Sequence, residues 1–310
     1  MNMIIIGQGA MGLLWYHHIL QLLEGDYKYS NAQLHLLPSN KPKSPYEQYS
    51  FIDKNNVEHV GKINYAQTKS IQMADIILLC LKSFQIPSAL KSISSQLKKN
   101  ASIILAHNGM GTLAELPKGI INKHNIYTLL TTHGSLRSAP LSITHTGIGS
   151  TDIGLVSGVT DLKQQQSLTQ LLDTALPNVK YHKEIKQKQW LKLAINCVIN
   201  PLTAVNNINN GQVNNAEYSQ NTIALLEEVI AVASVEGVKL DLGELKQTVE
   251  KVAQATAINS SSMRCDILAK RRSEIDYING YIHLLGIKHD IATPENTKMW
   301  QAVKSLDSRF

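Results

Sequence analysis

Three polar side chains recur every four residues along an otherwise apolar stretch in the second half of the chain. Lys192, Asn196 and Asn200 interrupt the segment 189–201, whose other residues are mainly apolar. At about 100° per residue the three positions lie within roughly 80° of one another on a helix, and they form one polar stripe. Burial lowers the pKa of a lysine, which lets it give and take a proton near neutral pH. The alternative is a solvent-exposed face, but such a face would carry more charge, so we predict a functional stripe.

A glycine-rich loop close to the N-terminus has the spacing G-x-G-x-x-G. In dinucleotide-binding loops the first glycine permits a tight turn, the second lets a pyrophosphate approach the backbone, and the third lets helix and strand pack closely. The loop follows an apolar run at 3–6 and precedes an amphipathic segment at 11–23, which is the required context. We therefore predict that a dinucleotide binds at Gly7, Gln8, Gly9, Ala10, Met11 and Gly12.

The segment after the second predicted strand, at 33–37, indicates which dinucleotide is bound. NAD sites usually place an acidic residue there to bind the ribose hydroxyls. This chain has no acid after residue 37 until Glu47 and instead carries Lys41 and Lys43. A neutral to basic segment suits a 2′-phosphate, so NADP is favoured over NAD. Alternatively, each lysine is a solvated loop charge.

Two further strand ends carry polar groups where open α/β sheets bind ligands. Lys82 follows the predicted strand at 76–81, and Asn108 follows the one at 102–107. Glycines at 109 and 111 would let a ligand come close to the backbone beside Asn108. We predict a ligand contact at both positions, although the segment 108–111 also fits a plain turn.

A serine and a glutamate farther along the chain lie near two predicted helix starts. The segments 260–263 and 273–276 each resemble the beginning of a helix, the second with the pattern of a capping box. Ser262 and Glu274 would be about 120° apart on one straight helix, so they converge only if the chain breaks between them. Ser273 as an N-cap would supply that break and place Glu274 in a first helical turn. A carboxylate there is often only stabilising, so a structural and a functional role both stay open.

The elements that must position these groups fall into two parts. Up to about residue 183, β-type runs alternate with helical segments, which is the pattern of a parallel sheet covered by helices. Beyond it, long helices follow one another. We expect an α/β protein with an N-terminal Rossmann-type parallel-sheet domain at 1–183 and an all-α C-terminal domain at 184–310. The predicted strands are 3–6, 33–37, 76–81, 102–107, 126–131 and 179–181, and the predicted helices are 11–23, 85–98, 161–175, 186–205, 217–236, 242–257, 260–270 and 273–285.

Length and composition exclude several classes of protein. The 310 residues, 43% hydrophobic and 17% charged, suit about two folded domains and exclude general disorder. No apolar run approaches the ~20 residues of a membrane span, and the N-terminus lacks the features of a secretory signal, so we expect a cytoplasmic protein. The net charge of +6 is spread out and only 5% of residues are aromatic, which favours a phosphate-bearing cofactor over nucleic acid.

Neither the cysteines nor the histidines indicate a metal centre. The three cysteines are isolated and lack CxxC spacing, and the 11 histidines have no acidic partner at ligand spacing. We therefore predict no metal site. A run of asparagines between 206 and 215 fits an irregular loop, since asparagine suits turns.

Together, these motifs resemble those of the 2-dehydropantoate 2-reductase family, also called ketopantoate reductases. The resemblance rests on the glycine loop, Lys82, the segments 107–111 and 190–204, the serines at 261 and 262, and the segment 274–280. These motifs occur in the same order over nearly the whole chain. The resemblance implies a Rossmann-type domain, a helical domain, and NADPH-dependent reduction of ketopantoate to pantoate on the route to pantothenate and coenzyme A.

The resemblance also implies roles for individual residues. By position, Lys192 resembles the family's catalytic lysine, which supplies a proton to the keto oxygen, and Glu274 resembles the glutamate that holds its ammonium group. The functional role of Glu274 is thereby favoured. The family's substrate-binding positions include a serine for the carboxylate and asparagines for the hydroxyl, and they correspond here to Ser262, Asn108, Asn196, Asn200 and Asn210. Asn108 also corresponds to a cofactor-binding position.

One departure from the family pattern concerns the 2′-phosphate of the cofactor. Close relatives carry an arginine after the second strand, whereas this chain has an insertion before the strand and no arginine after it. We predict that Ser39, Asn40 and Lys41 take its place.

Two other functions remain open at this stage. One is a reductase for a different branched 2-oxo acid, and the other is a non-catalytic NADP-binding regulator. We expect a small-molecule substrate, no nucleic acid or membrane partner, and a monomer or homodimer.

Overall fold

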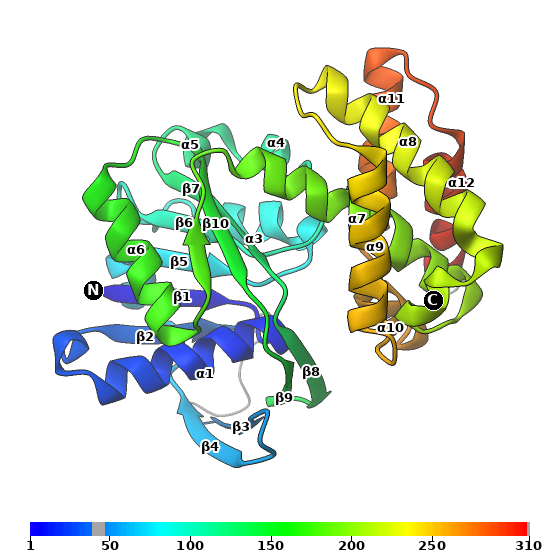
Figure 1. The fold of residues 1–310 in the computed structure, drawn as a ribbon. Coiled ribbons are helices and arrows are strands. Elements are labelled where there is room, and N and C mark those ends of the chain that lie inside the picture. Colours follow the sequence, from blue (N-terminus) through cyan, green and yellow to red (C-terminus); the bar gives the residue numbers. More distant parts are fainter. Residues whose placement is uncertain (39–46, 309–310) are drawn as a thin grey trace. The chain divides into compact units, whose positions relative to one another are not determined.

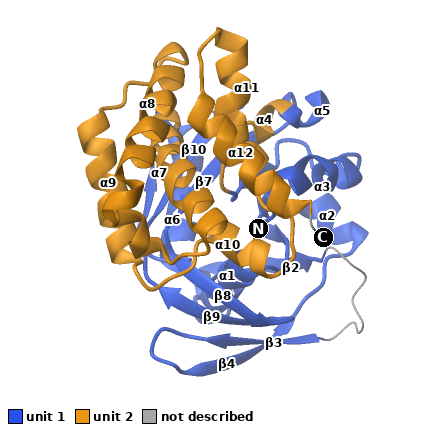
Figure 2. Cartoon of the chain, turned by 90° about the vertical axis from the view of Figure 1, so that its right-hand side faces the viewer, with its two compact units in different colours: residues 1–107, 115–185 blue, residues 108–114, 186–310 orange. Residues whose placement is uncertain are grey.

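The computed structural model describes residues 1–38 and 47–308 and divides into two compact units, coloured blue and orange in Figure 2. The first unit comprises Met1–His107 and Glu115–Ile185, and the second comprises Asn108–Ala114 and Lys186–Phe310. The short segment Asn108–Ala114 thus belongs to the helical unit although it follows a strand of the first unit. The expected domain division after residue 183 stays a prediction.

The framework of the first unit is a seven-stranded sheet (Figure 1). Its strands are β1 (Asn2–Ile6), β2 (Gln33–Leu37), β5 (Ile76–Leu79), β6 (Ser102–Leu105), β7 (Asn125–Thr131), β10 (Thr151–Ser157) and β11 (Val179–Tyr181). They are ordered β11-β10-β7-β6-β5-β1-β2, and all neighbours are parallel except β10 and β7. The central strands are almost entirely aliphatic, as burial on both faces requires. The α/β class and the six predicted strands are confirmed.

Helices α1 (Ala10–Gly25) and α6 (Leu162–Ala175) pack against each other beside this sheet. Asp161 caps α6 by accepting a hydrogen bond of 2.7 Å from the backbone N–H of Gln164, whereas no side chain caps α1. The helix predicted at 85–98 is shorter, because α3 ends at Ile93. The remaining short helices are α2 (Thr68–Met73), α3 (Ile86–Ile93), α4 (Thr112–Glu115) and α5 (Lys118–Ile121), with 3₁₀ turns at Tyr27–Tyr29 and Ser83–Gln85.

A second sheet of four strands lies outside the predicted set. It consists of β3 (Glu47–Ile52), β4 (Glu58–Ile63), β8 (Gly134–Ala139) and β9 (Ser142–Gly147). The order is β4-β3-β9-β8, so two hairpins from distant parts of the chain are joined by the parallel pair β3 and β9. Phe51 of β3 stacks on His17 of α1, with ring centroids 3.7 Å apart, which attaches this sheet to the first unit.

The second unit is helical. Besides most of α4, its helices are α7 (Ile185–Asn206), α8 (Ser219–Val235), α9 (Leu242–Ala255), α10 (Ser262–Leu268), α11 (Asn279–His289) and α12 (Pro294–Asp307), with 3₁₀ turns η3 (Asn210–Asn214), η4 (Ala216–Tyr218) and η5 (Ile275–Tyr277). The helix predicted to begin at Ser273 instead begins at Asn279, and α12 has no counterpart among the predicted helices. No helix in the described part of the chain is long and apolar enough to cross a membrane.

Five histidines gather where α1 meets the second sheet, and one of them, His59 of β4, is exposed and has its ring 5.4 Å from that of His17. His17 and His18 lie on α1, His145 lies on β9, and the ring of His133 is 5.5 Å from that of His145. Burial, and the neighbouring imidazoles, lower the pKa of His17 to about 4 and that of His18 to about 3. Burial also lowers the pKa values of His133 and His145. The fold therefore holds these four rings neutral.

Acidification should destabilise this part of the fold. Histidines in the unfolded chain titrate near pH 6.5. Below that pH the unfolded chain therefore binds more protons at these positions than the folded chain does, and the folded state loses stability. The loss of folding stability caused by His17 and His18 continues as the pH falls to their pKa values in the folded chain, about 4 and about 3. By pH 5 we expect the free energy of unfolding in urea to fall by about 2 kcal/mol for each of these residues, relative to pH 7.5.

His18→Gln should flatten this pH dependence. The matched control is His283→Gln, which removes a histidine that is bonded to Thr297 in the second unit, 2.8 Å away. An identical slope in His18→Gln and the wild type would contradict the assignment.

Candidate active site

The glycine loop after β1 has the geometry that a phosphate group requires. Gly7 has φ +109°, and a Cβ there would lie 2.4 Å from the carbonyl oxygen of Cys80. A Cβ on Gly12 would lie 1.9 Å from the carbonyl oxygen of Gly7, so this glycine permits the close packing of helix and strand. Gly9 is the N-cap of α1, and a Cβ there would meet nothing within 4 Å. The open space lies at a helix N-terminus without acidic residues in its first turn, so the loop fits a pyrophosphate.

Lys82 lies at the same edge of the sheet as this loop. Strands β1 and β5 pair with Ile6 opposite Leu79, so their carboxyl ends are adjacent. Lys82 is the N-cap of the turn Ser83–Gln85, and its backbone N–H donates to Gln85 Oε1 over 3.1 Å. Ser83 Oγ lies 3.0 Å from His107 Nδ1, which joins the ends of β5 and β6. The predicted 2′-phosphate residues Ser39, Asn40 and Lys41 lie outside the described residues.

The segment that carries Asn108 is bound to the turn that follows Glu274. The backbone N–H of Met110 donates to the carbonyl oxygen of Tyr277 over 2.8 Å. Gly109 has φ +79°, and a Cβ there would lie 2.3 Å from the same oxygen, so only glycine allows this approach. The fold therefore brings Asn108 and Glu274 into one unit, although they are far apart in the sequence. Glu274 is buried, with 5% of its surface exposed.

The polar stripe lies on α7, as predicted. Asn200 is buried, whereas Lys192 and Asn196 are half-buried. Lys192 is thus less buried than the sequence suggested, because the stripe borders the surface of the helical unit. The Nδ2 atom of Asn196 is buried and has no hydrogen-bond partner among the described residues.

Asn210 is held at the start of η3 by the end of α9. Its Nδ2 donates to Thr256 Oγ1 over 3.0 Å, and its backbone N–H donates to the carbonyl oxygen of Asn259. Its Oδ1 is buried and lacks a partner within the described part of the chain. An unpaired buried amide costs about 1–3 kcal/mol, and a polar ligand would remove that cost.

Ser262 is the first residue of α10 and is exposed. The helix begins there because Ser261 caps it, accepting a hydrogen bond of 3.1 Å from the backbone N–H of Arg264. The predicted helix start at 260–263 is therefore confirmed.

The predicted capping box at Ser273 is wrong. The Ser273 hydroxyl donates to Asp307 Oδ2 over 2.9 Å, and Glu274 is the N-cap of the 3₁₀ turn η5. Ile278, with φ −113° and ψ −98°, separates this turn from α11. Glu274 is consequently not in the first turn of an α-helix, and the chain breaks between Ser262 and Glu274 at the end of α10.

The described residues show neither a cluster of metal-ligating side chains nor an ionised form of Cys80 or Cys197. Among residues 1–38 and 47–308, no group of three or more His, Cys, Asp or Glu side chains is arranged to hold a metal ion. Burial raises the pKa of the Cys80 thiol to about 12 and moves that of Cys197 well above its usual value. Both thiols are therefore protonated at neutral pH.

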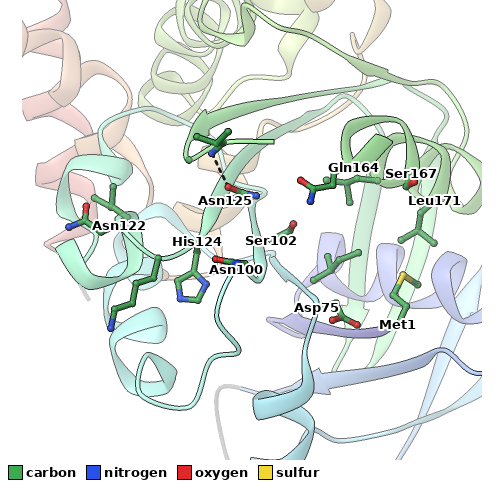
Figure 3. A pocket seen from close by; sticks show the side chains of 16 residues that line it. Met1, Asp75, Asn100, Ser102, Asn122, His124, Asn125, Gln164, Ser167 and Leu171 are labelled. Atoms are coloured by element: carbon green, nitrogen blue, oxygen red, sulfur yellow. Dashed lines mark hydrogen bonds between the residues drawn. The ribbon is translucent and has the colours of Figure 1, made fainter. Parts of the chain in front are cut away.

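A surface cavity of about 570 Å³ lies in the first unit (Figure 3). Its walls include Met1, Ile76, Ser102 and Asn125, which stand at or beside the amino ends of β1, β5, β6 and β7. Open α/β folds bind ligands beyond the carboxyl ends of their strands, so this cavity is at the wrong edge for the cofactor. None of the predicted site residues lines it.

Comparison with known families gives two matches that together span most of the chain. Residues 3–158 match the family described as ketopantoate reductase PanE/ApbA, and residues 184–307 match its C-terminal part.

Individual proteins agree with this result. The 2-dehydropantoate 2-reductase of Vibrio cholerae is 32% identical, with all of this chain and 99% of the relative covered, and that of Escherichia coli O157:H7 is 34% identical, with 100% and 96% covered. A solved D-mandelate dehydrogenase with NADH has a TM-score of 0.88 at 23% identity, covering 100% of this chain and 99% of the other. A solved PanE/ApbA family ketopantoate reductase from Ralstonia eutropha has a TM-score of 0.85 at 22% identity, with the same coverage of both chains. At these identities the solved structures show the fold alone.

Two glycine variants should separate the roles of the loop. Gly12→Ala places a methyl group against the Gly7 carbonyl, so we expect it to lower the free energy of unfolding by about 2 kcal/mol or more. Gly9→Ala fills open space and should leave Tm nearly unchanged, while weakening NADPH binding at least about tenfold, or 1.4 kcal/mol. Urea unfolding and a fluorescence titration with NADPH measure the two effects. Unchanged NADPH affinity in Gly9→Ala would argue against a phosphate site at this loop.

Proposed function

The chain belongs to the ketopantoate reductase family, and we propose that it reduces 2-dehydropantoate to (R)-pantoate with NADPH, in the pathway to pantothenate and coenzyme A. The observation that carries this proposal is the gathering, in one unit, of the stripe on α7 and of the segment 108–111 bound to the turn after Glu274. The curated relatives, which carry the name of this activity, match the chain over its full length.

The residues of the second unit have distinct roles in this proposal. Bound NADPH supplies a hydride to the carbonyl carbon of the substrate. Lys192 Nζ donates a proton to the oxygen of that carbonyl, so that the carbonyl becomes an alcohol and the lysine is left neutral. Glu274 holds the ammonium group in place and takes part in returning its proton. Ser262 binds the substrate carboxylate, and the remaining polar contacts come from Asn108, Asn196, Asn200 and Asn210.

Several further features belong to the same proposal. The glycine loop, Lys82 and Asn108 bind the cofactor, and Ser39, Asn40 and Lys41 bind its 2′-phosphate. The domain boundary lies after residue 183. The protein acts in the cytoplasm as a monomer or homodimer, and one structural neighbour, the Staphylococcus aureus ketopantoate reductase, is described as dimeric.

Steady-state oxidation of NADPH tests the proposal. Ketopantoate is compared with 2-oxoisovalerate, which lacks the hydroxymethyl group, and with phenylglyoxylate, the 2-oxo acid related to mandelate. Each assay is repeated with NADH in place of NADPH. Turnover of ketopantoate with NADPH supports the proposal. Preference for another 2-oxo acid would make the chain a reductase of different specificity, and NADPH binding without turnover would favour a regulator.

Lys192→Ala should lower kcat by about 100-fold or more, because no other group is assigned to protonate the developing alkoxide. NADPH affinity and the circular dichroism spectrum should stay unchanged. Lys186→Ala is the matched control, since Lys186 lies on the same helix outside the stripe and donates to the carbonyl oxygen of Glu236. Turnover close to that of the wild type in Lys192→Ala would remove this lysine from the mechanism.

Asn196→Ala should reduce discrimination between substrates. The unpaired Nδ2 is assigned to the substrate hydroxyl, so kcat/KM for ketopantoate should fall about tenfold or more, while that for 2-oxoisovalerate changes little. Asn206→Ala is the control, because that amide donates to the carbonyl oxygen of Leu202 at the exposed end of the same helix. An equal loss for both substrates would assign Asn196 a general structural role instead.

A further inference from the structure

Helix α7 contains a proline in its interior, at position 201. Proline has no backbone N–H, so the carbonyl group of the residue four positions earlier, Cys197, lacks the donor that this position supplies in a regular α-helix. Cys197 is fully buried, with 0% of its surface exposed. A buried carbonyl that is shielded from water needs another donor.

Asn279, the first residue of α11, provides that donor. Its Nδ2 donates to the carbonyl oxygen of Cys197 over 3.0 Å and to Asn296 Oδ1 over 2.9 Å. Both asparagines are fully buried. The orientation of the Asn279 amide is determined by its partners, because both are acceptors and its own oxygen would repel them.

Asn279 is in turn fixed by residues of two other helices, α12 and α8. The amide of Asn296 donates to the carbonyl oxygen of Leu225 over 3.1 Å and to Glu228 Oε2 over 2.8 Å, both on α8. Glu228 also accepts the backbone N–H groups of Glu295 and Asn296 in the first turn of α12, over 2.7 and 2.8 Å. Asn279 is therefore a fixed point in a buried network that joins α7, α8, α11 and α12.

The position of this contact connects it to the candidate site. Cys197 stands between Asn196 and Asn200 of the polar stripe, and Asn279 stands five residues after Glu274 in the sequence. A proline is also where a helix bends most easily. The hydrogen bond thus restrains α7 at its weakest point, relative to the segment that carries Glu274.

We propose that Asn279 is a positioning residue that acts through the Cys197 carbonyl to hold Lys192, Asn196 and Asn200 in register with Glu274. The effect on catalysis rests on the proposed reductase function. The effect on α7 itself does not, since it depends only on the hydrogen bond.

A double-mutant cycle with Pro201 tests this inference. Pro201→Ala restores the backbone N–H at position 201, so the Cys197 carbonyl regains a donor within its own helix. Asn279→Ala alone should lower kcat about tenfold or more, with NADPH affinity unchanged. In the Pro201→Ala background the same substitution should lower kcat by less than about threefold. A tenfold loss in both backgrounds would overturn the proposal.

Asn296→Ala is the matched control, because it removes a fully buried asparagine of the same network whose hydrogen bonds go to α8 and α11. Its loss of stability should not be relieved by Pro201→Ala, which supplies no donor at that place. If Pro201→Ala restored the stability of Asn279→Ala and of Asn296→Ala equally, removal of the proline would stabilise the unit in general. The proposal would then fail.

Amide hydrogen exchange provides a readout that needs no substrate. Peptides covering 192–206 should exchange faster in Asn279→Ala than in the wild type, and Pro201→Ala should reverse the change. If the wild type reduces none of the 2-oxo acids but this pattern holds, the proposed function fails while the role of Asn279 on α7 stands. Unchanged exchange in Asn279→Ala would refute that role.

Discussion

The helical unit depends on how α7 satisfies the carbonyl group of Cys197. The helix is otherwise regular across Pro201, so the missing N–H leaves one buried acceptor that must be paired from outside. Asn279, the first residue of α11, meets this requirement. Asn296 and Glu228 then hold Asn279, and the same carboxylate pairs the first N–H groups of α12. Asn279 Oδ1 is buried and has no hydrogen-bond partner among the described residues, so the network costs stability at that atom, while its other hydrogen bonds link the four helices.

The first unit meets a different constraint, which is close approach of backbone to backbone. Gly12 permits contact with the Gly7 carbonyl, and Gly7 permits contact with the Cys80 carbonyl, so strand, loop and helix are packed without side chains between them. Gly9 alone leaves open space, at the N-terminus of α1. The two units therefore offer different chemistry. The first presents backbone N–H groups that suit phosphates, and the second presents amide, hydroxyl, carboxylate and ammonium groups that suit a small polar acid.

Local patterns were enough to predict the central strands, the glycine loop and α7. The second sheet could not be predicted in this way, because β3 pairs in parallel with β9 from a distant part of the chain, and β9 contains a single aliphatic residue, Ile143. The capping box at Ser273 failed for a related reason: Asp307, 34 positions away, binds the serine hydroxyl. For the site, periodicity identified the stripe on α7, but the roles of Glu274, Ser262 and Asn210 followed from the family resemblance. Pro201 within a helical pattern does indicate an unpaired carbonyl at Cys197, although it cannot indicate a donor that lies 82 positions away.

The unpaired amide atoms explain why an apolar helix tolerates its polar stripe. Asn196 offers a buried donor and Asn210 a buried acceptor, neither with a partner in the described part of the chain. Each unpaired atom costs stability in the fold, and a ligand group that forms a hydrogen bond with it recovers that cost. A hydroxyl group can accept a hydrogen bond from an amide donor or donate one to an amide acceptor, whereas a methyl group can do neither. Sites built to bind a hydroxyl reject analogues that lack it far more strongly than apolar pockets distinguish sizes. Under the proposed function, these unpaired amide atoms on α7 and η3 are the groups that would distinguish a hydroxylated 2-oxo acid from one that lacks the hydroxyl.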